Sequence, residues 1–75
     1  MKIYCIIIFN TSYHALKAEQ ILKELNNKFK IIPVPREFSS NCGVALRIPW
    51  DKNEKVVSLL RSKNVRIEEV HRWER

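Results

Sequence analysis

The chain has 75 residues, a formal net charge of +6 and 45% hydrophobic residues. This length suits a single domain spanning residues 1–75, with one core and no room for a second. No apolar run approaches the roughly 20 residues of a membrane-spanning helix, and the apolar stretch near the N-terminus lacks a signal-peptide cleavage site. We therefore expect a cytoplasmic protein without a membrane segment, whose charge suits an anionic substrate, an acidic partner or nucleic acid.

The first half of the chain predicts a strand, a helix and a second strand. Residues 2–9 are an apolar, β-branched run with the length of a central strand. Residues 10–12 offer helix N-caps, and apolar residues then recur at helical spacing until the two asparagines at 26–27. Residues 29–34 follow as an edge strand, because Pro33 has no N–H to donate to an inner ladder.

The second half predicts a loop, a strand, a helix and a last strand. Residues 35–43 form the loop. In the strand after it, the alternation of side chains predicts one buried and one open face. The buried positions are Val44, Leu46 and Ile48, and the open positions are Ala45 and Arg47. The second helix opens near Asp51, which with Glu54 resembles a capping box. Residues 65–73 form the last strand, with its inward positions at Val65, Ile67 and Val70.

The element order βαββαβ predicts an α+β, ferredoxin-like fold, with a four-stranded antiparallel sheet and two helices on one face. Right-handed crossovers place the third strand between the first and the second. Residues 10–14 and the loop at 35–43 should then meet at one edge of the sheet, and residues 49–51 should lie at the opposite edge. The face away from the helices would carry Tyr4, Ile6 and Ile8 uncovered. Such an apolar surface favours a homodimer or docking to another protein.

Cys42 is the strongest candidate for a working group. It lies in a polar loop before the only glycine, Gly43, which permits unusual backbone angles. The loop offers hydroxyl, amide and backbone donors from Ser39, Ser40 and Asn41. Arg36 and Arg47 flank it, and both kinds of group favour a thiolate. The second cysteine, Cys5, lies among isoleucines and is expected to be an inert core thiol. The two cysteines form neither a CxxC pair nor a zinc pattern, so we expect no metal.

Four other side chains could carry chemistry. His14 lies in the first turn of the first helix, where it would donate a proton or pair with the thiolate; the alternative is an exposed histidine near the cap. Glu37 is either an acid–base group or a salt-bridge partner of Arg36, with the second reading favoured. His71 and Trp73 have no predicted partner.

Two segments resemble one family. They are Ile-Pro-Val-Pro-Arg-Glu-Phe-Ser-Ser-Asn-Cys-Gly-Val-Ala-Leu-Arg at 32–47 and Ser-Tyr-His-Ala-Leu-Lys-Ala-Glu at 12–19. In order and spacing they resemble the selenium/sulfur carrier-like family of small prokaryotic proteins. The motif positions that the resemblance marks are His14, Pro35, Arg36, Ser39, Ser40, Cys42, Gly43 and Arg47.

The resemblance implies a carrier or accessory protein rather than an enzyme. Cys42 would hold sulfur or selenium as a persulfide or selenosulfide, without an organic cofactor. The implied partners are a sulfur- or selenium-donating lyase and an acceptor enzyme.

Two alternatives remain. One is a small basic module that binds nucleic acid or protein; nucleic acid is not favoured, because no RNP-like motif is present. The other is a thiol enzyme or redox sensor, which would lack a resolving cysteine if Cys5 is buried.

Overall fold

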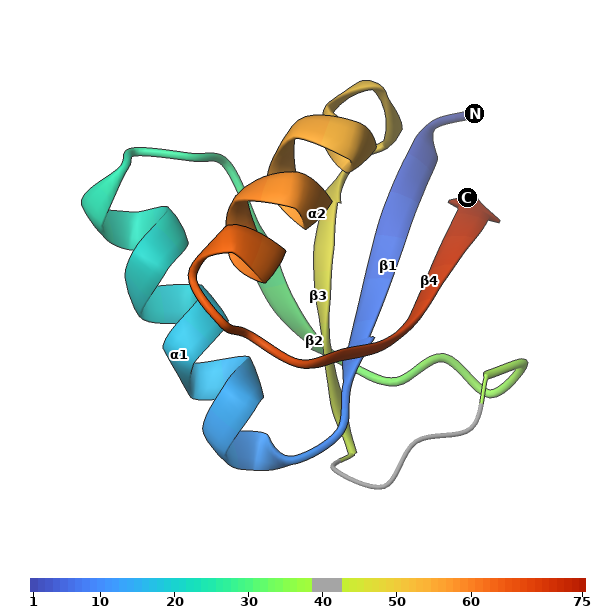
Figure 1. Ribbon diagram of the computed structural model, residues 1–75. Coiled ribbons are helices and arrows are strands. Elements are labelled where there is room, and N and C mark those ends of the chain that lie inside the picture. Colours follow the sequence, from blue (N-terminus) through green and yellow to red (C-terminus); the bar gives the residue numbers. More distant parts are fainter. Residues whose placement is uncertain (39–42) are drawn as a thin grey trace.

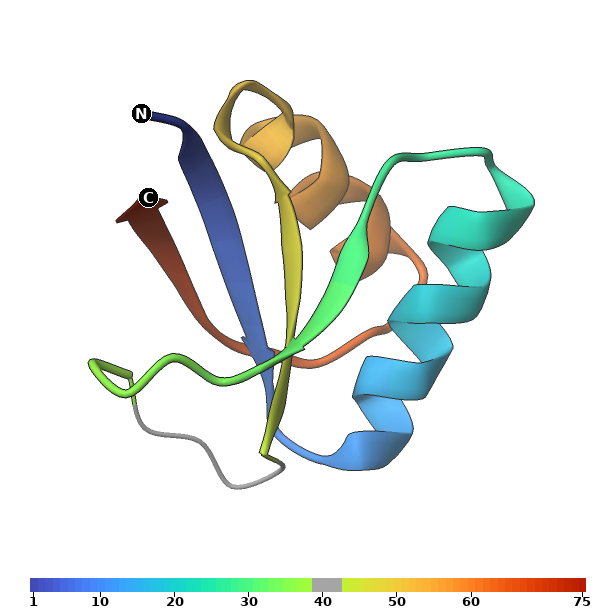
Figure 2. The same ribbon diagram turned by 180° about the vertical axis from the view of Figure 1, so that it is seen from behind.

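The computed structural model describes residues 1–38 and 43–75, and its elements follow the predicted order (Figure 1). They are β1 (Ile3–Phe9), α1 (Ser12–Glu24), β2 (Lys30–Pro33), β3 (Val44–Pro49), the 3₁₀ turn η1 (Trp50–Lys52), α2 (Asn53–Ser62) and β4 (Ile67–Glu74). The strands form one antiparallel sheet in the order β2-β3-β1-β4. Both helices cover the same face of this sheet (Figures 1 and 2). The predicted ferredoxin-like α+β fold is therefore confirmed.

The strand register follows from the hydrophobic pattern of β1. This strand is the most apolar of the four and lies between β3 and β4, where it is buried from Cys5 to Phe9. β2 pairs with β3 alone, so Pro33 lies on an edge strand as predicted. The two chain ends are joined by backbone hydrogen bonds between Lys2 and Arg75, of 2.7 and 2.9 Å.

The helix boundaries match local capping chemistry in α1 but not in α2. Thr11 is the N-cap of α1, and its hydroxyl accepts from the backbone N–H of His14 at 3.4 Å. After α1, Asn26 takes a positive φ of 56°, which asparagine tolerates better than most residues. The capping box expected at the start of α2 is wrong: η1 occupies that turn, and Lys52 caps α2 without a side-chain hydrogen bond.

The main core lies between the sheet and the two helices. β1 contributes Cys5, Ile7 and Phe9, and the helices contribute most of the remaining buried side chains. These are Ala15, Ala18 and Leu22 from α1 and Val56 and Leu60 from α2, packed with Leu46, Ile48 and Val65. Val70 lies on this face of the sheet as predicted, paired with Ile7, but it is 36% exposed because β4 is an edge strand.

A second apolar cluster lies on the face of the sheet away from the helices. Ile6, Ile8 and Ala45 are buried there, with Val34 and Phe38 packed against them. The segment after β2 crosses this face and covers it (Figure 2). The predicted uncovered face is therefore wrong over Ile6, Ile8 and Ala45, and a homodimer through that face loses the observation on which it depended.

Within the two described ranges, the helices are too short and too polar for any of them to cross a bilayer.

Candidate functional site

The end of β1, the first turn of α1 and the start of β3 lie together at one end of the sheet, where strands begin or finish. Ile8 in β1 pairs with Ala45, and Pro33 in β2 pairs with Val44. Ser12 and Ala15 of α1 line the same small hollow as Val44. The prediction that the first turn of α1 and the loop before β3 meet at one edge is confirmed for the described end of that loop.

Gly43 takes the backbone conformation that the sequence suggested. Its φ is +77°, in the left-handed region that glycine adopts without the steric cost of a Cβ atom. A Cβ placed on this residue would meet nothing within 4 Å, and the residue is exposed. Its carbonyl oxygen accepts from the backbone N–H of Val34 at 3.3 Å. The chain thus leaves the candidate loop through a turn that is open to solvent.

The predictions for Ser39, Ser40, Asn41 and Cys42 concern residues outside the described ranges. Their places in the sequence are fixed between Phe38 and Gly43, both of which the structure describes.

His14 lies in the first turn of α1, as predicted, and is half-buried. Its Nδ1 atom accepts a hydrogen bond of 3.2 Å from the backbone N–H of Arg66, just before β4. A neutral imidazole that accepts at Nδ1 carries its proton on Nε2. Tyr13 meets the ring edge-on at a centroid distance of 5.1 Å. Nδ1 is therefore occupied by this backbone hydrogen bond, and Nε2 is the ring nitrogen that could donate a proton to a ligand.

The two predicted arginines occupy different places. Arg36 is exposed and lies three residues before the undescribed part of the loop. Arg47 lies in the middle of β3, and its guanidinium carbon is 4.3 Å from the centroid of the Tyr4 ring. Because Tyr4 pairs with Pro49 at the far end of β3, Arg47 is directed away from Gly43. Of the two, Arg36 is the better placed beside the cysteine loop.

The loop that leads to Cys42 is held by two side chains of β4, an arrangement that sequence reasoning missed. The indole N–H of Trp73 donates to Glu37 Oε2 at 3.1 Å. The pKa of Glu37 lies below its usual value because its own backbone N–H, then the Trp73 N–H and the nearby charge of Arg75, favour the carboxylate. Glu37 is thus an acceptor that fixes the loop, and the favoured reading of Glu37 as a partner of Arg36 is wrong.

Phe38 adds a second contact between this loop and β4. Its ring lies parallel to the imidazole of His71, and His71 Nε2 is 2.7 Å from Glu69 Oε1. The period-two pattern of β4 placed His71 and Trp73 on one face, but only the tertiary fold brings residues 37 and 38 over them.

Cys5 is the inert thiol that the sequence predicted. It has no exposed surface, and burial raises the pKa of its thiol to about 11. A thiol that stays protonated is a poor nucleophile and a poor metal ligand. Within residues 1–38 and 43–75, no group of three His, Cys, Asp or Glu side chains gathers around a common point.

Fold and sequence together define a small α+β protein in which Glu37 and Phe38, just before the segment that contains Cys42, are anchored to the edge strand β4. Residues 4–72 match the family model described as "Putative Se/S carrier protein-like", so the chain belongs to that family. No curated protein and no solved structure matches the chain.

Proposed function

We propose that this protein carries sulfur or selenium on Cys42 and passes it to an acceptor protein. The observation that carries the proposal is the family match over residues 4–72, which includes the whole cysteine loop. The hollow that Ser12 and Ala15 of α1 share with Val44, the residue after Gly43, supports it, because the N-terminus of α1 then lies at the same end of the sheet as the loop.

The loading step is a thiol exchange. The Cys42 thiolate attacks the terminal sulfur of a donor persulfide, R–S–SH. A new S–S bond forms on Cys42, the donor's S–S bond breaks, and R–S⁻ leaves and takes up a proton. No net oxidation or reduction occurs. In the unloading step, an acceptor thiolate attacks the outer sulfur and releases Cys42 as a thiolate.

A persulfide anion needs positive charge and N–H donors around it. In the proposed site, Arg36 supplies the charge and the first turn of α1 supplies the end of a helix dipole. His14 Nε2 is the group proposed to hold or deliver the proton. Gly43 leaves room for the donor and acceptor proteins, because nothing lies within 4 Å of its missing Cβ.

The two contacts from β4 suit a carrier. A carrier must present its sulfur to two protein partners in turn, so the loop has to be exposed and yet held at its base. Glu37 and Phe38 are fixed on Trp73 and His71, immediately before the segment that bears Cys42. Fixing the base lowers the entropy lost when a partner binds the loop.

Mass spectrometry of the intact protein tests the proposal. After incubation with a cysteine desulfurase and cysteine, the wild type should gain one sulfur atom, and added thiol should remove it. Cys42→Ser should gain none. Cys5→Ala is the matched control, because it removes the other thiol and should load like the wild type.

Two results would contradict the proposal. One is equal loading of Cys42→Ser and the wild type, which would exclude Cys42 as the acceptor atom. The other is a wild type that stays unloaded while a reference sulfur carrier loads in the same reaction. The same assay with a selenocysteine lyase and selenocysteine decides between sulfur and selenium.

A further inference from the structure

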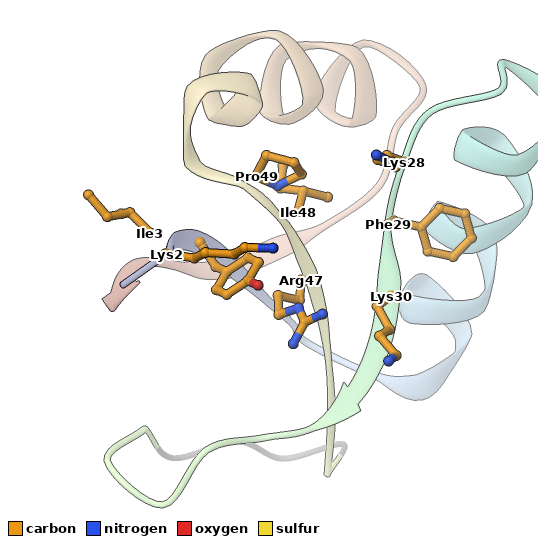
Figure 3. Close-up of a pocket in the computed structure, with 9 residues that line it drawn as sticks. Lys2, Ile3, Lys28, Phe29, Lys30, Arg47, Ile48 and Pro49 are labelled. Atoms are coloured by element: carbon orange, nitrogen blue, oxygen red, sulfur yellow. The ribbon is translucent and has the colours of Figure 1, made fainter. Parts of the chain in front are cut away.

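A basic hollow opens at the end of the sheet opposite the cysteine loop. It has a volume of about 490 Å³, within the roughly 300–1,000 Å³ typical of ligand sites. Its lining residues come from the start of β1, from β3 and from the segment that enters β2 (Figure 3). Four of the nine are cationic, namely Lys2, Lys28, Lys30 and Arg47, and none is acidic.

The cations are placed against one another. Lys30 in β2 and Arg47 in β3 are direct partners in the antiparallel register, and like charges directly opposite each other destabilise a sheet. The ion pairs among the described side chains are His71–Glu69 and Arg72–Glu74, so neither of these cations is neutralised there. A bound anion would relieve the repulsion.

An aromatic ring lies among the charges. The guanidinium of Arg47 lies over the half-buried ring of Tyr4, with its carbon 4.3 Å from the ring centroid. This cation–π contact holds the guanidinium group beside an aromatic surface. Guanidinium planes and aromatic rings are the groups on which unpaired bases stack.

We propose that this hollow binds single-stranded nucleic acid. Neighbouring strands lie about 4.8 Å apart, so the backbones of Lys30 in β2 and of Lys2, just before β1, lie at least about 10 Å apart, with β3 between them. That spread suits a ligand with several separated phosphates. An acidic protein surface would satisfy the charges but would make no use of a stacked arginine and tyrosine.

The hollow is separate from the cysteine loop. β3 runs from Val44, next to Gly43, to Pro49 in the hollow's wall, a length of about 17–20 Å for six residues. The buried cluster under Phe38 occupies the face between them. The proposal therefore stands apart from sulfur transfer and holds or fails by itself.

Fluorescence anisotropy with a labelled oligouridylate of about 12 nucleotides tests the proposal, since single-strand sites commonly span roughly 4–16 nucleotides. The wild type should bind, and log K should fall with log salt concentration with a slope of about −3, as expected for four phosphate contacts on a single strand. The double variant Lys30→Gln/Arg47→Gln should reduce that slope by about 1.4 and weaken binding about tenfold or more. Lys55→Gln removes one charge from the helix side of the molecule and should change binding less than about twofold.

Tyr4 provides a second, uncharged test. Tyr4→Leu keeps an apolar side chain against the outer cluster and should weaken binding about fivefold or more, whereas Tyr4→Phe keeps the ring and should bind like the wild type. Thermal melts show which variants are folded, and only those are compared. Cys42→Ser should bind as the wild type does, which separates this result from the sulfur-loading assay.

Three outcomes would overturn the proposal. They are the absence of oligouridylate binding at low salt, an equal loss of binding in Lys55→Gln and in the double variant, and displacement of the oligonucleotide by inorganic phosphate at an equal phosphate concentration. The last would show a site for a single small anion.

Discussion

The phenyl ring of Phe38 stacks on the imidazole of His71, with ring centroids 4.0 Å apart and planes 9° from parallel. This contact joins the loop before Cys42 to the edge strand β4. It also closes the apolar cluster on the second face of the sheet, against which Phe38 packs.

Phe38→Ala should lower the free energy of unfolding by about 1–2 kcal/mol, because full burial of such a side chain is worth about 1.5–3 kcal/mol and Phe38 is half-buried. It should also slow sulfur loading of Cys42, since the base of the loop loses its anchor. Urea unfolding and intact-mass loading measure the two effects. Leu16→Ala, at a side chain 54% exposed on α1, is the matched control and should change neither. Normal loading of a folded Phe38→Ala protein would contradict the anchoring role.

Iodoacetamide should modify one thiol in the native protein and two in denaturant. Cys5 has no exposed surface and stays protonated near neutral pH, so the native reaction belongs to Cys42. Peptide mapping identifies the modified residue. In native Cys42→Ser the label should be absent, and rapid labelling of that variant would show that Cys5 is reachable.

Stability should fall between about pH 9 and pH 11. The pKa of Cys5 rises from its usual value near 9 to about 11 on folding, because burial disfavours the thiolate. In that window the unfolded chain loses the proton that the native chain keeps, so rising pH favours unfolding. The two-unit difference corresponds to about 2–3 kcal/mol at the upper end. Urea midpoints of the wild type and Cys5→Ala across this range measure the effect; the variant should show a shallower decline, and parallel curves would contradict this account.

Gly43→Ala should destabilise the fold by about 1–2 kcal/mol. Its φ of +77° costs an L-residue roughly that amount, and open space around the missing Cβ excludes a steric contribution. Gly43→Asn should cost less, because asparagine enters the left-handed region more readily. Thermal unfolding compares the two variants. A loss as large for Asn as for Ala would point to a cause other than backbone conformation.

Arg36→Gln should slow alkylation of Cys42 at neutral pH, because a cation near the loop favours the thiolate. Arg47→Gln should leave the rate within about twofold, because its guanidinium lies over Tyr4 and away from Gly43. Stopped-flow alkylation measures both rates. A larger effect from Arg47 than from Arg36 would reverse this assignment of the two arginines.

The alternation and helical spacing of apolar residues determined the element order, the ferredoxin-like fold, the edge position of β2 and the burial of Cys5. These features follow from local periodicity together with the handedness of crossovers. The left-handed backbone conformation of Gly43 could also be predicted from the sequence, because glycine has no Cβ atom.

Only the tertiary structure decided what covers the second face of the sheet. The alternation in β3 predicted that Ala45 lies on an open face. It is buried, because residues 34–38 fold back over it. The contacts of Glu37 with Trp73 and of Phe38 with His71 join segments more than 30 residues apart. The direction of Arg47 depends in the same way on Tyr4, which only the pairing of β1 with β3 brings close. The strand order could be predicted, but local patterns carry no information about these side-chain contacts, because the energy that selects them arises when distant segments pack.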